Sequence, residues 1–123
     1  MSMEEFPLVL VTEVNAIVGI DLCEALREAG YRVVGPVATV ADVEAYLERE
    51  QPDFAVIEPW LKDGSCAGTM ERLRQRGVPF VVHSVSTPDE PIGRNFANVP
   101  WLSKPATPWD VVIALDGMAM ETL

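Results

Sequence analysis

Short apolar runs alternate along the chain with segments in which apolar residues recur every three or four positions. Continuous apolar runs predict strands that are buried on both faces, and the wider spacing predicts amphipathic helices. The predicted strands are residues 8–11, 31–34, 54–57, 80–83 and 101–102. The predicted helices are 18–29, 40–47, 70–76 and 108–118, with at most a turn or two of helix around 92–96.

Residues that interrupt regular structure mark the element ends. Gly35-Pro36 is expected to stop the second strand, and residues 62–65 read as a loop. Three prolines and a glycine make residues 87–100 poor helix material. Thr39 and Thr107 are the expected N-caps of the helices that follow them. The order is therefore strand and helix in strict alternation, with a weak fourth helix.

This alternation predicts an α/β fold: a doubly wound, five-stranded parallel sheet covered by helices on both faces. A length of 123 residues with 49% hydrophobic composition fits one domain with a substantial core. We find no internal repeat or linker, so residues 1–123 are expected to form a single domain.

Charge and composition exclude several classes of function. The net charge of −10 argues against binding nucleic acid through its phosphates. No apolar stretch is long enough for a membrane span, and the acidic first six residues do not resemble a signal peptide. Cys23 and Cys66 form neither a disulfide framework nor a metal-ligand spacing, and Cys23 is expected to be a small buried residue. We expect a cytoplasmic protein without contacts to nucleic acid or membrane.

Polar residues stand at the carboxyl ends of four predicted strands: Glu13, Glu58, Ser84 and Lys104. In a doubly wound sheet such ends meet where the strand order reverses. Acids there suit a divalent cation, whereas a hydroxyl and an ammonium suit phosphate oxygens. Taken singly, an acid at a strand end is more often a helix-capping or solvated group, and Lys104 is more often a surface lysine, so the combination carries the argument.

The chain resembles the receiver domain of two-component response regulators, CheY-like proteins with the flavodoxin-like strand order 2-1-3-4-5. The resemblance covers about residues 7–118. It rests on segments 9–13, 26–36, 52–58, 63–64, 77–80 and 102–105, the last containing the dipeptide Lys104-Pro105. It implies a bacterial, stand-alone regulator without an output domain, and a signalling module that is not an enzyme.

The resemblance also assigns roles by position. In the family, an aspartate after strand three accepts a phosphoryl group from a histidine kinase, and two acids after strand one bind Mg²⁺ with it. A hydroxyl and a lysine contact the phosphoryl group, and an aromatic residue in strand five acts as a switch. In this sequence the positions hold Glu58, Glu13 with Val14, Ser84, Lys104 and Trp101, respectively.

Two departures from the family pattern change the expected chemistry. Val14 has no oxygen for Mg²⁺, and Glu58 lengthens the acceptor by one methylene. Phosphoryl transfer depends on position and charge compensation, and both are disturbed. We therefore predict a pseudo-receiver without a cofactor, in which Mg²⁺ binding is weak or absent.

Two interpretations of Glu58 remain open. It acts as a partial phosphomimetic that reaches Lys104 and Ser84, or it pairs with Lys104 and locks one state. Either way the domain would act through protein partners, such as a histidine kinase or a downstream signalling protein, and a homodimer is a further option. The competing functions are a phosphorylation-competent receiver and a small-ligand-sensing module. An enzyme is disfavoured, because residues 15–19 lack a glycine-rich phosphate loop and no G-x-S-x-G occurs.

Four aromatic side chains have two explanations each. Trp101 is either the switch residue or a bulky side chain that fills the thin cover left by the weak fourth helix. His83 is either a group that titrates near neutral pH or a hydrogen-bonded structural residue. Trp60, Trp101 and Trp109 either contribute to a surface that binds a partner or pack in the core or at its edge. Residues 87–100 lie where receivers usually present a partner surface.

Overall fold

The computed structural model describes residues 6–96 and 98–121. Five strands form one parallel sheet in the order β2-β1-β3-β6-β7. This confirms the predicted strand order, because β6 and β7 are the fourth and fifth strands of the main sheet. The elements are β1 (Leu8–Thr12), α1 (Ala16–Glu28), β2 (Arg32–Val37), α2 (Val40–Arg49), β3 (Phe54–Ile57), β4 (Trp60–Leu61), β5 (Gly64–Ser65), α3 (Ala67–Gln75), β6 (Phe80–Ser84), α4 (Pro91–Arg94), β7 (Trp101–Ser103) and α5 (Pro108–Glu121).

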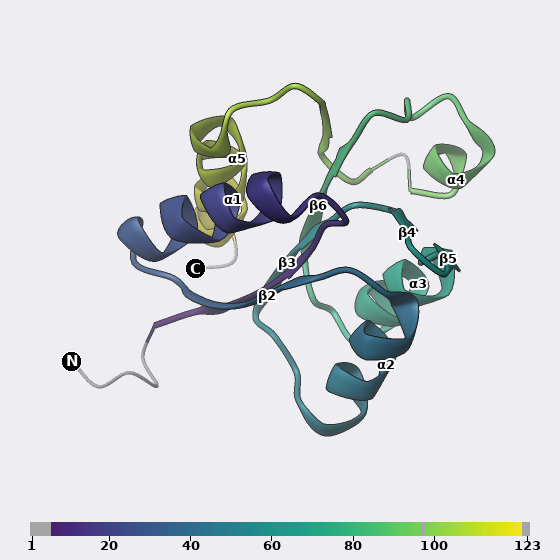
Figure 1. Cartoon of the computed structure of the whole chain (residues 1–123), viewed down its shortest axis with the longest axis horizontal. Coiled ribbons are helices and arrows are strands. Elements are labelled where there is room, and N and C mark those ends of the chain that lie inside the picture. Colours follow the sequence, from purple (N-terminus) through teal and green to yellow (C-terminus); the bar gives the residue numbers. More distant parts are fainter. Residues whose placement is uncertain (1–5, 97, 122–123) are drawn as a thin grey trace.

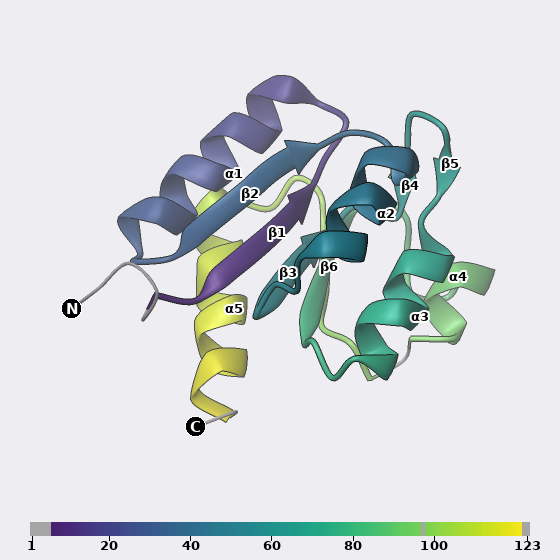
Figure 2. The same cartoon turned by 90° about the horizontal axis from the view of Figure 1, so that it is seen from below.

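Helices cover both faces of the sheet. Helices α1 and α5 lie on one face, and α2 and α3 lie on the other (Figures 1 and 2). Each face buries its own apolar cluster, with Leu22 and Leu115 in the first and Leu47 and Leu73 in the second. Cys23 is buried in the first cluster, as predicted. None of the helices in the described part of the chain combines the length and apolarity that a membrane span needs.

Strand β2 does not stop at Gly35-Pro36, contrary to the prediction. It continues to Val37, whose carbonyl accepts a hydrogen bond from the Glu13 amide at 3.0 Å. Gly35 has φ +132°, and a Cβ there would lie 2.5 Å from the Val11 carbonyl oxygen. The strand therefore bends through a register shift beside β1, a close approach that glycine permits.

Residues 62–65 are not a plain loop, which corrects a second expectation. Trp60–Leu61 and Gly64–Ser65 pair as a two-stranded antiparallel hairpin, β4 and β5. The Asp63 carboxylate at its turn accepts hydrogen bonds from the amides of Val40 and Ala41, and these bonds lower the pKa of Asp63. The hairpin therefore joins Thr39 in capping the start of α2.

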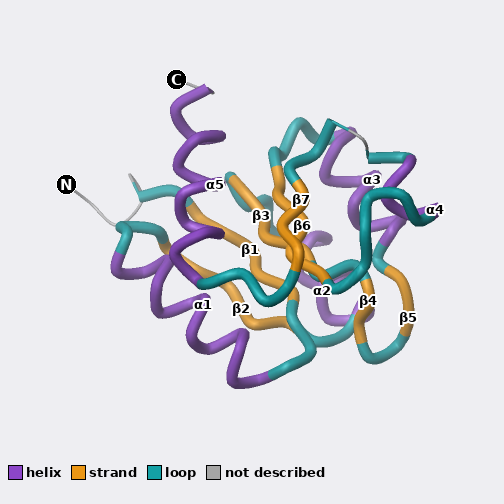
Figure 3. Tube along the Cα trace, turned by 90° about the horizontal axis from the view of Figure 1, so that it is seen from above, coloured by secondary structure: helices purple, strands orange, loops and turns teal. Residues whose placement is uncertain are grey.

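The weak fourth helix is confirmed. Helix α4 has four residues, and a loop connects it to β6 (Figure 3). Helix α5 begins with a reciprocal cap: the Asp110 amide donates to Thr107 Oγ1, and the Thr107 amide donates to the Asp110 carboxylate. These boundaries follow the prolines, glycine and threonine that marked them in the sequence.

Candidate functional site

The fold brings the four predicted strand-end residues together. Glu13 follows β1, Glu58 follows β3, Ser84 ends β6 and Lys104 follows β7. These strands are consecutive neighbours in the sheet, so their carboxyl ends share one edge. The Lys104 amide donates to the Ser84 carbonyl at 2.9 Å, which fixes the last two ends to each other.

Glu58 is buried, with 4% of its surface exposed, and both of its carboxylate oxygens have partners. Oε1 accepts hydrogen bonds from the Ser84 hydroxyl and from the Trp60 amide, each at 3.1 Å. Oε2 lies 3.1 Å from Lys104 Nζ. The carboxylate thus contacts a hydroxyl, an amide and an ammonium at once.

Lys104 joins the two acids of the site. Its Nζ lies 2.7 Å from Glu13 Oε1 as well as 3.1 Å from Glu58 Oε2. The second Glu13 oxygen accepts a hydrogen bond from the Asn15 amide at 3.0 Å. Burial alone would lower the pKa of Lys104, but the hydrogen bonds and charges of Glu13 and Glu58 outweigh that effect and raise it. The site is therefore a buried cluster of two carboxylates and one ammonium.

The residues present do not suit Mg²⁺. The surface of Val14 is 38% exposed, and its side chain supplies no ligand atom. Both acids that could contribute oxygens are engaged with the Lys104 ammonium. Within residues 6–96 and 98–121, no group of three or more His, Cys, Asp or Glu side chains is arranged to hold a metal ion. A hard divalent ion needs several such oxygens.

A chain of hydrogen bonds links Glu58 to Trp101. The Ser84 hydroxyl donates to Glu58 and accepts from the Ser86 amide at 3.1 Å. The Ser86 carbonyl accepts from the Trp101 indole N–H at 2.8 Å. Trp101 itself is half-buried and packs against the cluster on the α2–α3 face. Hydrogen bonds through Ser84 and Ser86 thus connect Glu58 with Trp101, the residues at the positions that the resemblance assigns to the acceptor and the switch.

Three polar residues of the site were not singled out by the sequence. Thr12 Oγ1 donates to the Glu58 carbonyl and accepts from the Glu58 amide, at 3.1 and 2.9 Å. The Cys66 thiol donates to the same carbonyl at 3.4 Å, and burial together with the charge of Glu58 raises its pKa to about 12. Ser86 supplies the link to Trp101. Thr12 had one available signal, its place at the end of the first strand.

His83 lies in β6 beside Ser84 but points to the other side of the sheet, among residues of α1 and of the segment that enters α5. It is 4% exposed, and its Nε2 has no hydrogen-bond partner among the described residues. The interpretation of His83 as a fully hydrogen-bonded structural residue therefore does not fit this atom. Burial, helped by the Lys104 charge, lowers its pKa against the opposing charges of Glu13 and Glu58.

The three tryptophans differ in how far their side chains are exposed. Trp60 is 47% exposed and Trp109 is 52% exposed, whereas Trp101 is half-buried. Trp60 belongs to the hairpin β4–β5, and Trp109 belongs to the first turn of α5.

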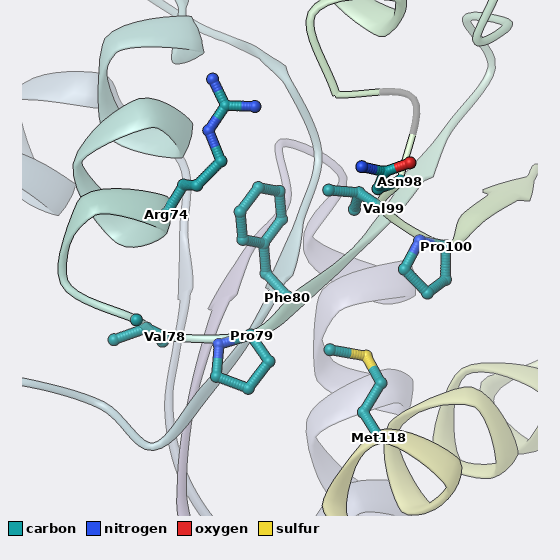
Figure 4. Close-up of a pocket in the computed structure, with 9 residues that line it drawn as sticks. Arg74, Val78, Pro79, Phe80, Asn98, Val99, Pro100 and Met118 are labelled. Carbon is teal, nitrogen blue, oxygen red and sulfur yellow. The ribbon is translucent and has the colours of Figure 1, made fainter. Parts of the chain in front are cut away.

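A larger cavity lies away from these residues. It has a volume of about 570 Å³ and is lined by Phe80, Val99, Pro100 and Met118, with Arg74 at one side (Figure 4). Phe80 begins β6 and Pro100 precedes β7, so the cavity is at the amino ends of these strands. It does not coincide with the crevice beside Glu58 where the sequence suggested a small ligand.

Comparison with solved structures identifies the fold. A CheY-like response regulator receiver domain protein from Methanospirillum hungatei JF-1 aligns over 95% of this chain and 96% of its own, with a TM-score of 0.80 and 18% identity. The chemotaxis response regulator CheY4 of Vibrio cholerae aligns over 90% and 97%, with a TM-score of 0.77 and 16% identity. The chain has the fold of CheY-like receiver domains. The resemblance found in the sequence and the expected topology are both confirmed.

Two further matches to this chain have higher sequence identity. SdrG from Sphingomonas melonis Fr1 is 29% identical, with a TM-score of 0.75 over 94% of this chain and 97% of its own. The transcriptional regulatory protein PdtaR of Mycobacterium tuberculosis is 28% identical over 112 residues, which are 88% of this chain and 54% of that protein. The chain thus spans about half the length of the curated relatives it matches. No family model matches the chain.

Proposed function

We propose that this receiver domain works in two-component signal transduction by contacting protein partners, with Glu58 as a fixed charge in place of a phosphorylated aspartate. In this proposal the domain does not accept a phosphoryl group and needs no Mg²⁺. Its partner is a histidine kinase or a downstream signalling protein.

The observation that carries the proposal is the position of the Glu58 carboxylate. It contacts Ser84 and Lys104 together, the two residues that the family resemblance assigns to the phosphoryl group. Lys104 also pairs with Glu13, so its single positive charge already faces two carboxylates. An added phosphoryl group would have to displace these contacts before it could form its own.

The same geometry argues against acceptance of phosphate. A nucleophilic carboxylate must be free to attack and must have its charge compensated by Mg²⁺ as phosphate transfers. Here both Glu58 oxygens are engaged, and Val14 removes one metal ligand. Position and charge, the two factors on which the transfer depends, are both unfavourable.

Of the two interpretations of Glu58, the hydrogen bond from Ser84 favours the partial phosphomimetic. An ion pair with Lys104 alone would require no contact to β6. Instead Ser84 turns its hydroxyl to Glu58 and carries the connection through Ser86 to Trp101. Glu58 carries one charge where a phosphoryl group carries about 1.5 to 2, so the mimicry is incomplete. A fixed charge biases a two-state balance by its differential contacts, and these contacts extend to the switch position.

The test restores the lost chemistry. The wild-type chain, the single variant Glu58→Asp and the double variant Val14→Asp/Glu58→Asp are incubated with acetyl phosphate and Mg²⁺, and intact mass is measured. We expect a phosphoryl adduct on the double variant, little on the single variant and none on the wild type. Omitting Mg²⁺ is the control and should abolish the adduct. Ready phosphorylation of the wild type would overturn the proposal.

A further inference from the structure

We propose that the cavity at the amino ends of β6 and β7 binds a small molecule that combines an aromatic body with one carboxylate. The cavity has a volume of about 570 Å³, which is within the range of pockets that hold small organic ligands. Glu58 follows the carboxyl end of β3, so the cavity lies at the opposite end of the parallel sheet. This site is therefore separate from the residues on which the proposed function rests.

Strand β6 extends past the start of β7, and the cavity lies beside this overhang. The pairing of the two strands begins at Val82 and Trp101, so Phe80 and Val81 have no partner in β7. The Val82 amide donates to the Pro100 carbonyl at 2.9 Å. Proline has no N–H with which the ladder could continue to the Phe80 carbonyl. The edge of β6 is therefore open at its amino end, where Phe80 and Pro100 line the cavity.

The open edge leaves a backbone donor at the cavity. Alternate residues of a strand direct their backbone groups to the same neighbouring strand, and Val82 and Ser84 direct theirs to β7. Phe80 lies two residues before Val82, so its N–H points to the same side. Among the described residues no hydrogen bond engages this N–H, although Phe80 is 4% exposed. A buried donor without a protein partner suits an acceptor oxygen on a ligand.

Arg74 supplies a positive charge at one end of the cavity (Figure 4). Its guanidinium lies 4.7 Å from the centre of the Phe96 ring and donates to the Asn95 carbonyl at 2.8 Å, so its position is fixed. It also pairs with Glu71, but the two side chains are 49% and 42% exposed, and exposed pairs contribute little. Among the described residues these hydrogen bonds use two of the five N–H donors of a guanidinium. Arg74 therefore keeps donors for a ligand carboxylate.

The other polar group and the surrounding charge favour the same ligand. Asn98 lies at the same end of the cavity as Arg74 and adds an amide donor (Figure 4). An ammonium would be repelled by Arg74 and would offer it no acceptor, whereas a carboxylate accepts from both residues. Arg72 in α3 and Arg76 just after it add positive charge to this region of a chain whose net charge is −10. A carboxylate is thus repelled by most of the surface and attracted to this part of it.

The remaining walls determine the body of the ligand. They are apolar and consist of Val78, Pro79, Phe80, Val99, Pro100 and Met118. The Phe80 ring already forms an edge-to-face pair with Phe96, with ring centroids 5.9 Å apart, and a ligand ring would extend this pair. The Met118 side chain lies away from Arg74 (Figure 4), and its thioether makes favourable contacts with aromatic rings. An aromatic ring near Met118 and a carboxylate near Arg74 therefore match the two ends of the cavity.

The experiment uses two probes of the same shape. The first is 4-phenylbutyrate, and the second is 4-phenylbutanamide, in which a neutral amide replaces the carboxylate. Both are titrated into the ¹⁵N-labelled chain at neutral pH, and dissociation constants are obtained from the amide shifts. The variants are Arg74→Gln and Asn98→Asp. Arg72→Gln is the matched control, because Arg72 lies on the same helix but pairs with Glu44 and is not among the described residues that line the cavity.

We expect 4-phenylbutyrate to bind with a dissociation constant of about 1 mM, in keeping with its size, and to shift amides around the starts of β6 and β7. Arg74→Gln should weaken its binding by about tenfold, because a hydrogen bond to a charged group is lost. Asn98→Asp should weaken it by a similar factor of about ten, because a like charge faces the carboxylate. The amide probe should bind about tenfold more weakly and change by no more than about twofold in either variant. Arg72→Gln should change neither affinity by more than about twofold.

Four results would overturn the inference: shifts centred away from the starts of β6 and β7, equal affinity of the two probes, equal losses from Arg74→Gln and Arg72→Gln, or unchanged binding in Asn98→Asp. Arg74→Gln also removes the contact with the Asn95 carbonyl. Asn98 is exposed, so its variant tests the site without that disturbance. The titration involves no phosphorylation, so this site and the proposed role of Glu58 can fail separately.

Discussion

At the scale of the residue, Lys104 is the group on which the other polar residues of the site depend. Glu13 and Glu58 are buried almost completely, and each has one oxygen within 3.1 Å of the Lys104 ammonium. Buried charges are stable only when paired and hydrogen-bonded. Removing one of three charges therefore affects all of them.

Replacing Lys104 with methionine should destabilise the chain by about 3 kcal/mol, because two buried carboxylates would lose their common cation. Urea unfolding followed by tryptophan fluorescence measures the loss. The double variant Lys104→Met/Glu58→Gln should recover at least about 1 kcal/mol of it, since one uncompensated charge is removed. A double variant less stable than Lys104→Met would contradict the view that charge, and not side-chain packing, sets the cost.

The sequence predicted the positions of these residues better than their contacts. Glu13, Glu58, Ser84 and Lys104 could be placed at one edge because parallel strands end together. The contacts of Thr12, Cys66 and Ser86 could not be predicted, since Thr12 and Cys66 donate to the Glu58 carbonyl and Ser86 accepts from the Trp101 indole through its own carbonyl. That His83 Nε2 has no hydrogen-bond partner among residues 6–96 and 98–121 likewise depends on which groups the fold brings near it.

At the scale of the element, prolines and glycines predicted the ends of helices better than the ends of strands. The prolines and the glycine of residues 87–100 limited α4 to four residues, as expected. Gly35-Pro36 misled, because the same residues that end a strand can also bend it when the neighbouring strand approaches closely. The hairpin β4–β5 was missed because strands of two residues show no alternation to detect.

Helix α4 gives a prediction of its own, because Gly93 packs against the loop before it. A Cβ at Gly93 would lie 2.4 Å from the backbone of Pro88, so Gly93→Ala must push α4 away from that loop. We expect a loss of about 1 to 3 kcal/mol, measured by urea unfolding.

The matched control is Gly117→Ala in α5, where a Cβ would meet no atom within 4 Å. Alanine favours helix over glycine, so this variant should gain about 0.5 to 1 kcal/mol. If Gly93→Ala also gained stability, helix propensity and not the contact with Pro88 would govern α4.

At the scale of the whole molecule, the charge is both large and unevenly placed. The chain carries −10, with an acidic α1 on one face and arginines on α3 on the other. Such an excess keeps a protein soluble but destabilises the compact state through self-repulsion. The buried cluster at Lys104 is shielded from salt, whereas the surface charges are not.

Salt should therefore stabilise this domain without a specific role for Mg²⁺. Raising sodium chloride from about 0.01 M to about 0.1 M shortens the Debye length from about 30 Å to about 10 Å. We expect the thermal midpoint to rise by about 4 °C as surface repulsion is screened.

Magnesium chloride at matched ionic strength should give the same rise in the wild type, because Glu13 and Glu58 are held by Lys104 and Val14 offers no ligand. In Val14→Asp/Glu58→Asp it should give an additional rise, since an ion that binds only the folded state stabilises it. A rise in the thermal midpoint that is specific to Mg²⁺ in the wild type would show that the two carboxylates leave Lys104 and bind the metal. It would favour a phosphorylation-dependent receiver.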